Sequence, residues 1–270
     1  MTSLIQTLST PVRPDLTLPG LQRRVPAVFA DHQFEKTGRN YVFISTRDLV
    51  EALMQAGFSP TDAQQRRSRG ARVGFCKHML RFRHVTESIP IVDCMPEIIL
   101  INAHDSSSSF QLRGGLYRFV CCNGLIVSLA EFGVIRIPHR GNVLADVVEG
   151  ARRITAQFAG IGGTIERMAR TELSMTERLA LAEKALHLRF RSQAHLPFGA
   201  EQLLTVHRAE DRGEDLWHTF NVIQENVIQG GIAGRSAHGR ATVSRKVGAI
   251  PETVRLNIEL WQQAMALIKS

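Results

Sequence analysis

The sequence predicts an α+β protein, with a curved antiparallel β-sheet meander backed by a long helix and a mostly helical C-terminal half. Three observations support this fold class. Apolar runs separated by turn residues between Glu97 and Val127 predict a meander of strands. A long amphipathic segment begins near Asn142, and further amphipathic segments with capping residues follow it. One short helical pattern between two strand patterns precedes the meander.

The meander is predicted from apolar runs at 97–102, 111–122 and 125–129, with an expected extension at 134–137. Asn123-Gly124 lies between the second and third runs. This dipeptide favours the positive φ values of a type I′ hairpin turn, so we expect the turn there.

Three regions are predicted along the chain. Residues 1–40 contain four prolines at 11, 14, 19 and 26 and little periodicity, which predicts an irregular N-terminal arm. Residues 41–172 form the α+β core domain, with strands expected at 41–44 and 73–83 and a helix at 46–56 that ends at Gly57. Residues 173–270 form a helical C-terminal region.

The C-terminal half carries clear helix signals. The long segment from Asn142 contains Gly160, Gly162 and Gly163, which we expect to kink or divide it. Ser174 and Glu177 form a capping box that begins a helix. Residues 215–229 are predicted to form a helix closed by glycines, and 251–268 a last helix.

Composition favours a polyanion as partner. The chain of 270 residues has a net charge of +8 and a pI near 9.9, with an ordinary 44% of apolar residues. The four cysteines include no C-x-x-C pair, which predicts buried reduced thiols. We find no signal peptide and no apolar run long enough for a membrane span, so we expect a cytoplasmic protein that does not bind a membrane.

The cations are concentrated in two stretches. No acidic residue lies between Asp62 and Glu87, and the predicted strand at 73–83 places its cations on one face. A second basic stretch, 231–249, is predicted to be a mobile loop that orders on a phosphate backbone. Aromatic residues beside arginines on the central strand would stack bases. The predicted nucleic-acid contacts are Arg66, Arg67, Arg69, Arg72, Lys77, Arg81, Arg83, Arg113, Tyr117, Arg118, Arg240, Arg245 and Lys246.

Signals for catalysis are weak. The sequence contains no Walker A loop and no G-x-S-x-G elbow. His104 and Asp105 suggest a metal-dependent nuclease as an alternative, but their spacing matches no metal motif. We therefore predict no catalytic residue, no metal site and no cofactor.

Two resemblances add context. The block NAHDSSSSFQLRGGLYRFVCCNGLIV, with KHMLRFR before it and LWHTFNVIQENVIQGG after it, resembles a family of phage- and plasmid-like proteins with a domain of unknown function, of the domain-of-unknown-function 932 type. That resemblance implies a mobile element in a bacterial host. The order of strands and helices is also similar to the core of Rad52-type single-strand annealing proteins, which implies a homo-oligomer, with a ring as one form.

The predicted function is non-catalytic nucleic-acid binding for a plasmid or prophage, with single-stranded DNA binding or annealing in recombination as the specific form. Two alternatives stay open. One is a protein-binding inhibitor of a host defence system, and the other is the metal-dependent nuclease.

Overall fold

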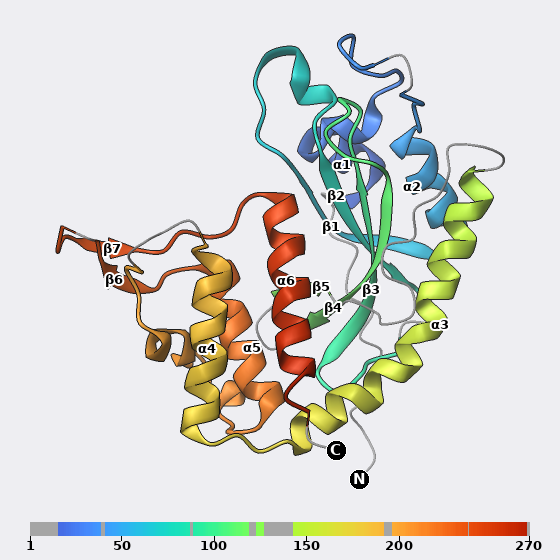
Figure 1. Cartoon of the computed structure of the whole chain (residues 1–270). Helices are drawn as coiled ribbons and strands as arrows, with labels where there is room; N and C mark the ends of the chain where they lie inside the picture. Colours follow the sequence, from blue (N-terminus) through green and yellow to red (C-terminus); the bar gives the residue numbers. More distant parts are fainter. Residues whose placement is uncertain are drawn as a thin grey trace. The chain divides into compact units, whose positions relative to one another are not determined.

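The computed structural model describes residues 16–38, 41–86, 89–118, 123–126, 143–191, 196–236 and 238–268 (Figure 1). Its architecture is α+β, as the sequence predicted: a five-stranded antiparallel sheet is followed by a mostly helical C-terminal half. The helices are α1 (Leu18–Arg24), α2 (Thr46–Gln55), α3 (Val143–Arg170), α4 (Met175–Arg189), α5 (Leu216–Gln229) and α6 (Ile250–Met265). The strands are β1 (Phe58–Gln65), β2 (His78–His84), β3 (Cys94–Asn102), β4 (Gln111–Arg118), β5 (Asn123–Ile126), β6 (Ala233–Arg235) and β7 (Ala241–Val243).

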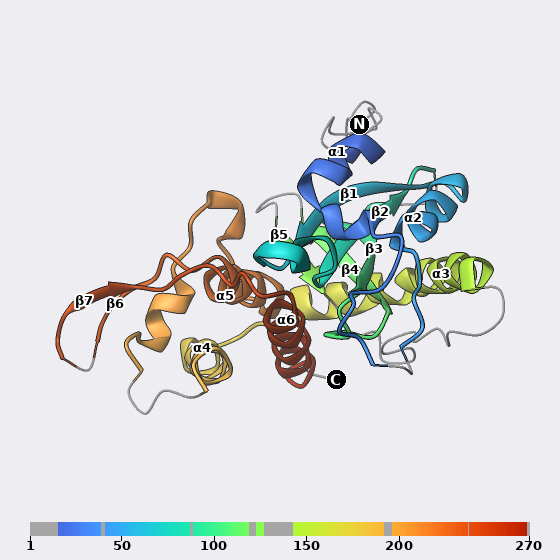
Figure 2. The ribbon, with the colours of Figure 1, turned by 90° about the horizontal axis from the view of Figure 1, so that it is seen from above.

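The large sheet is a meander in which strands that are consecutive in sequence lie side by side, in the order β1-β2-β3-β4-β5 (Figure 2). In the register, His78 pairs with Asn102 and Phe82 with Ile98 across β2 and β3. Every residue of β3 is buried. The predicted strand at 97–102 is therefore confirmed and begins three residues earlier.

Strand β1 was not predicted. Its sequence, FSPTDAQQ, contains Pro60 and Asp62, residue types that are depleted in strands. Because β1 is at the edge of the sheet, a proline is tolerated there. The pairing with β2 shifts between Pro60 and Asp62, which marks a β-bulge at Thr61.

Two predicted strands differ from the structure. Residues 41–44 form no strand, and Ser45 caps α2 by accepting a hydrogen bond from the Asp48 backbone amide. The strand predicted at 73–83 begins only at His78, because the 3-10 helix η3 (Gly70–Gly74) precedes it. The predicted Asn123-Gly124 turn is also wrong: these residues belong to β5 and pair with Arg118 and Tyr117. The predicted strand at 134–137 lies outside the described residues.

The segment predicted as an irregular arm contains ordered structure. Thr17 caps α1 with its hydroxyl, and the 3-10 helix η2 (Pro26–Phe29) follows. Leu21, Val25 and Val28 are fully buried. This segment is therefore part of the hydrophobic core, and both α1 and α2 contact β1.

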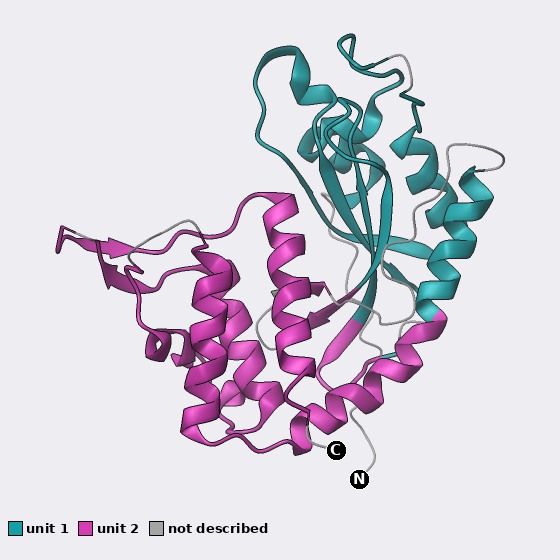
Figure 3. Cartoon of the chain, in the orientation of Figure 1, with its two compact units in different colours: residues 1–89, 96–114, 134–155 teal, residues 90–95, 115–133, 156–270 magenta. Residues whose placement is uncertain are grey.

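The chain forms two compact units (Figure 3). Unit 1 comprises Met1–Ile89, Pro96–Gly114 and Val134–Thr155, and unit 2 comprises Pro90–Met95, Gly115–Gly133 and Ala156–Ser270. Strands β3 and β4 and helix α3 contribute residues to both units. In unit 2, α4, α5 and α6 pack against one another.

The helices of the second half follow their sequence signals with one exception. Helix α3 continues through Gly160, Gly162 and Gly163 without a break, so these glycines do not divide it. Ser174 and Glu177 form the predicted capping box of α4. Asp215 caps α5, and Gly230 closes it with φ of +72°. Among the described residues, no helix is long and apolar enough to cross a membrane. Cys76 and Cys94 are buried thiols, as predicted.

The stretch 231–249 is not the loop that the sequence predicted. It forms a two-stranded ribbon, in which Ala233, Gly234 and Arg235 of β6 pair with Val243, Thr242 and Ala241 of β7. Thr242 and Val243 are β-branched and favour a strand, but the glycines of this stretch are typical of a loop.

Candidate nucleic-acid interface

Four of the predicted cations lie together on the segment between β1 and β2, which we call the basic loop (Arg66–Arg72). The side chains of Arg66, Arg67, Arg69 and Arg72 are all exposed. No described acidic side chain forms an ion pair with any of them, and the carboxylate nearest in sequence, Asp62, pairs instead with Arg24 at 2.9 Å. The basic loop therefore has uncompensated positive charge that is open to solvent.

The backbone of the basic loop is held at both ends. The Arg66 amide donates to the Lys77 carbonyl at 2.7 Å, and the Cys76 thiol donates to the Arg66 carbonyl at 3.2 Å. The Gln65 side chain spans the loop base: its Oε1 accepts from the Ala27 amide, and its Nε2 donates to the Val73 carbonyl. At the end of helix η3, the Phe75 backbone amide donates a hydrogen bond to the Arg72 carbonyl. These bonds fix the path of the loop while its arginine side chains stay exposed.

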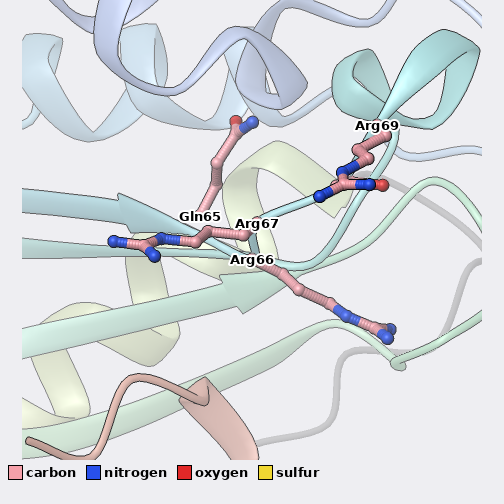
Figure 4. A pocket seen from close by; sticks show the side chains of 5 residues that line it. Gln65, Arg66, Arg67 and Arg69 are labelled. Atoms are coloured by element: carbon pink, nitrogen blue, oxygen red, sulfur yellow. The ribbon is translucent and has the colours of Figure 1, made fainter.

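An open pocket of about 450 Å³ lies on this loop, lined by Gln65, Arg66, Arg67, Ser68 and Arg69 (Figure 4). The labelled arginine side chains point in different directions from the backbone. Such divergence does not suit a single small anion, which needs donors that converge on one point. It suits a polyanion whose charges are spread along a chain.

Aromatic rings lie beside the basic loop. The Phe34 and Phe75 ring centroids are 5.5 Å apart, and the His32 ring meets Phe75 edge-on at 5.1 Å. The Arg72 guanidinium lies 5.3 Å from the centroid of Phe34. Both phenylalanines are partly exposed. One acidic side chain, Asp31, lies at the edge of this group, where it contacts His32.

Sequence reasoning did not find Phe34 and His32 as part of a site. They come from the segment predicted as an irregular arm, more than 30 residues before the loop, and no spacing in the sequence links the two. The backbone places them there: the Phe34 amide donates to the His104 carbonyl, and the His104 amide donates to the Phe75 carbonyl.

Lys77 is only half-buried and follows the loop. Burial lowers the pKa of its ammonium group, and Asp105 partly opposes that shift. It stays in the candidate interface as a flanking cation.

Arg81 and Arg83 do not belong to this exposed surface. Both lie on one face of β2, as the alternation predicted, but their side chains are buried against Glu97 of β3. Arg81 Nη1 is 3.0 Å from Glu97 Oε2, Arg83 Nη2 is 2.9 Å from Oε1, and the Thr61 hydroxyl donates to Oε1. We call these four residues the Glu97 cluster. Both guanidinium groups are engaged with the one buried carboxylate of Glu97, so we leave Arg81 and Arg83 out of the candidate interface.

The cations of β4 are similarly engaged. Arg118 is buried and forms ion pairs with Asp93 and Asp211. Asp93 also accepts a hydrogen bond from the Trp217 indole, and Asp211 accepts one from Arg208. Arg118 is thus a structural residue of unit 2 and not a phosphate contact. Arg113 is half-buried and donates to the Gln111 side chain, and Tyr117 is half-buried in β4.

His104, the residue behind the nuclease alternative, is fully buried in unit 1 with Thr46, His78 and Asn102, a group we call the histidine cluster. His78 Nδ1 lies 3.0 Å from the Cys76 carbonyl oxygen, which can only accept, so this nitrogen carries the proton. His78 Nε2 then accepts from the Thr46 hydroxyl at 2.9 Å.

The Thr46 hydroxyl has one proton, which it donates to His78. Its oxygen must therefore be the acceptor in its other two hydrogen bonds. Its oxygen accepts from Asn102 Nδ2 at 3.0 Å and from His104 Nε2 at 3.1 Å. His104 Nδ1 is left as an acceptor without a hydrogen-bond partner among the described residues. Burial lowers the pKa of His78 to about 4. Burial and the neighbouring His78 lower the pKa of His104 to about 3, although Asp105 and the Ala27 backbone favour the charged ring.

The histidine cluster is a buried neutral network and not a metal centre. Across the described part of the chain, no group of three or more His, Cys, Asp or Glu side chains is placed to hold a metal ion. The nuclease alternative therefore gains no support from His104.

Comparison with known proteins identifies the family. The family described as "Domain of unknown function (DUF932)" matches residues 33–261, which include the basic loop, the sheet and most of the C-terminal helices. The chain belongs to the DUF932 family. This confirms the resemblance found in the sequence.

Two relatives of this DUF932 protein come from Escherichia coli (strain K12). UPF0380 protein YafZ is 40% identical and UPF0380 protein YfjQ is 39% identical, each over 254 residues that cover 94% of this chain and 92% of the relative. Their names state no activity. No solved structure matches the chain, so the analogy to Rad52-type proteins has no structural support.

Proposed function

We propose that this DUF932 protein is a non-catalytic nucleic-acid-binding protein, and that the basic loop of unit 1 binds single-stranded DNA. The observation that carries the proposal is the presence, on one anchored loop, of four exposed arginines without acidic partners among the described residues, beside partly exposed aromatic rings. Arginines follow a phosphate backbone and rings stack on bases, and single-strand-binding proteins combine the two.

The charge of the loop supports a polyanion as ligand. Each arginine that meets a phosphate releases a condensed counterion, so binding should weaken steeply with salt. A loop whose arginines were there for stability would pair them with carboxylates, as the Glu97 cluster does with Arg81 and Arg83. The basic loop lacks such pairs among the described residues.

The rings support a single strand over a duplex. In a duplex the base faces are stacked on one another, so Phe34 and Phe75 would find no free face. In a single strand, each stacked base contributes about 1–3 kcal/mol whatever its identity. The Arg72 guanidinium over Phe34 already shows that this ring face accepts a planar cation, which a base would replace or extend.

The preformed backbone supports binding without a large ordering cost. Because Arg66, Gln65 and Cys76 tie both ends of the loop, mainly side chains need to become ordered when a strand binds.

The test removes three of the four cations. In the variant Arg66→Ala/Arg67→Ala/Arg69→Ala, we expect the affinity for a fluorescent single-stranded oligonucleotide to fall at least tenfold near 0.1 M salt. The slope of log affinity against log salt should decrease by about 0.7 for each phosphate that the variant no longer neutralises. Fluorescence anisotropy over a salt series, without divalent metal, measures both quantities.

A charge-matched control is Arg152→Ala/Arg167→Ala/Arg170→Ala, which removes three exposed arginines from α3. It should keep most of the affinity and the slope. Phe34→Leu should weaken binding to the single strand more than to a duplex competitor. Equal affinity of the loop variant and the control would contradict the proposal, as would failure of the unmodified chain to bind at ordinary salt.

A further inference from the structure

Unit 2 carries a second group of exposed cations on the ribbon formed by β6 and β7, which we call the basic ribbon (residues 230–248). Its exposed charged side chains are Arg235, Arg240, Arg245 and Lys246. The sequence contains no acidic residue between Glu225 and Glu252. In Figures 1 and 2 the ribbon extends outward from the helices of unit 2.

The base of the ribbon is firmly attached to unit 2. The Arg235 amide donates to the Pro197 carbonyl at 2.8 Å, and the Val247 amide donates to the Ile228 carbonyl at 2.8 Å. Arg189 of α4 donates to the Arg245 carbonyl at 3.0 Å. Gly234 lies so close to Pro197 that a Cβ there would be 2.1 Å from its carbonyl oxygen. The backbone at the base of the ribbon is therefore anchored to unit 2.

The two faces of the ribbon differ. Gly234 and Thr242, which pair with each other, are half-buried and belong to the anchored face. Ala233, Ala241 and Val243 are exposed, so the outer face is narrow and has no bulky side chain apart from Arg235. Arg240, Arg245 and Lys246 flank this face at the tip and the base.

We propose that the basic ribbon binds double-stranded nucleic acid by entering a groove, with its arginines and lysine on the flanking phosphates. The major groove of B-DNA, about 12 Å wide, admits a two-stranded ribbon. Residues 230–249 contain no Phe, Tyr or Trp. Without rings the ribbon cannot stack free bases, which argues for a duplex and against a single strand. The basic loop is a different surface, for which we propose a single strand as ligand, so duplex binding by the ribbon does not depend on it.

The first test removes charge from the ribbon in the full chain. For Arg240→Ala/Arg245→Ala/Lys246→Ala, we expect the affinity for a duplex of about 25 base pairs to fall at least tenfold near 0.1 M salt. The salt slope should fall by about 0.9 for each phosphate that the variant no longer neutralises. The same variant should bind a single-stranded oligonucleotide nearly as well as the unmodified chain does.

The outcomes separate this inference from the proposed function. If the ribbon variant binds duplex as tightly as the unmodified chain does, the ribbon inference is overturned. The basic loop proposal is tested separately, by the variant Arg66→Ala/Arg67→Ala/Arg69→Ala. If the ribbon variant loses single-strand and duplex affinity equally, the cations act as general phosphate contacts and groove entry is refuted. If the unmodified chain binds no duplex, the ribbon inference is also refuted, and an acidic protein partner becomes the alternative ligand of the ribbon.

A second variant displaces the ribbon without changing its charge. Gly230 has φ of +72°, and a Cβ there would lie 2.6 Å from the Arg245 carbonyl carbon and 2.7 Å from the Ser244 carbonyl oxygen. Gly230→Ala should therefore separate the ribbon from the end of α5 and lower duplex affinity several-fold, with faster proteolysis at 230–248. Gly248→Ala is the control, because nothing lies within 4 Å of a Cβ there. Equal duplex affinity of these two variants would contradict the groove model.

Discussion

Replacing Glu97 with glutamine is expected to lower the free energy of unfolding by about 3–5 kcal/mol. The substitution keeps the shape of the side chain but removes its charge. Arg81 and Arg83, whose side chains are only 6% and 11% exposed, then lose the carboxylate that compensates both of them. A buried charge without its partner retains its desolvation cost. Removal of the single carboxylate therefore destabilises the folded protein strongly. Chemical denaturation followed by circular dichroism measures the loss.

The control for this prediction is Glu51→Gln, which breaks the exposed ion pair between Arg47 and Glu51 on α2. An exposed pair on a helix contributes about 0.3–0.5 kcal/mol, so this variant should differ little from the unmodified chain. A variant that replaces Arg81, Arg83 and Glu97 together with apolar residues should recover much of the stability lost in Glu97→Gln. Similar unfolding midpoints for Glu97→Gln and Glu51→Gln would show that the Glu97 cluster is not the buried network described above.

Stability is expected to fall as the pH is lowered from about 6.5 towards 4, because of the histidine cluster. Burial holds the pKa of His78 at about 4 and that of His104 at about 3, whereas an unfolded histidine titrates near 6.5. Below pH 6.5 the unfolded chain therefore binds protons that the folded chain does not. The contribution of the cluster is full above pH 6.5 and is lost as the pH falls through the folded pKa values, by up to about 1.4 kcal/mol per pH unit for each histidine.

Denaturant unfolding at several values between pH 4 and pH 7.5 tests this dependence. In His78→Gln and in His104→Gln, the slope of stability against pH should be smaller than in the unmodified chain, even where the overall stability has also fallen. His238→Gln, which changes an exposed histidine of the basic ribbon, should leave the slope unchanged. Parallel stability curves for all four proteins would refute the assignment of neutral, buried rings.

Some parts of the candidate interface were predictable from the sequence and others were not. A run of arginines without acids around it is a local property, so the grouping of Arg66, Arg67, Arg69 and Arg72 is visible in the sequence. Arg81, Arg83 and Arg118 were misjudged, because alternation in a strand tells which side chains share a face but not what covers that face. Their carboxylate partners Glu97, Asp93 and Asp211 come from elsewhere in the chain. Phe34 was missed because it also comes from a distant part of the chain.

Features that depend on neighbours along the chain follow from the sequence: the α+β class, the capping box of Ser174 and Glu177, and the two basic stretches. Tertiary contacts determine which cations are exposed, that β1 pairs with β2, and that residues 231–249 form a ribbon. The physical reason is that caps and periodicity are set within a few residues, whereas burial and strand pairing depend on interactions between distant segments. Those interactions leave no regular spacing in the sequence.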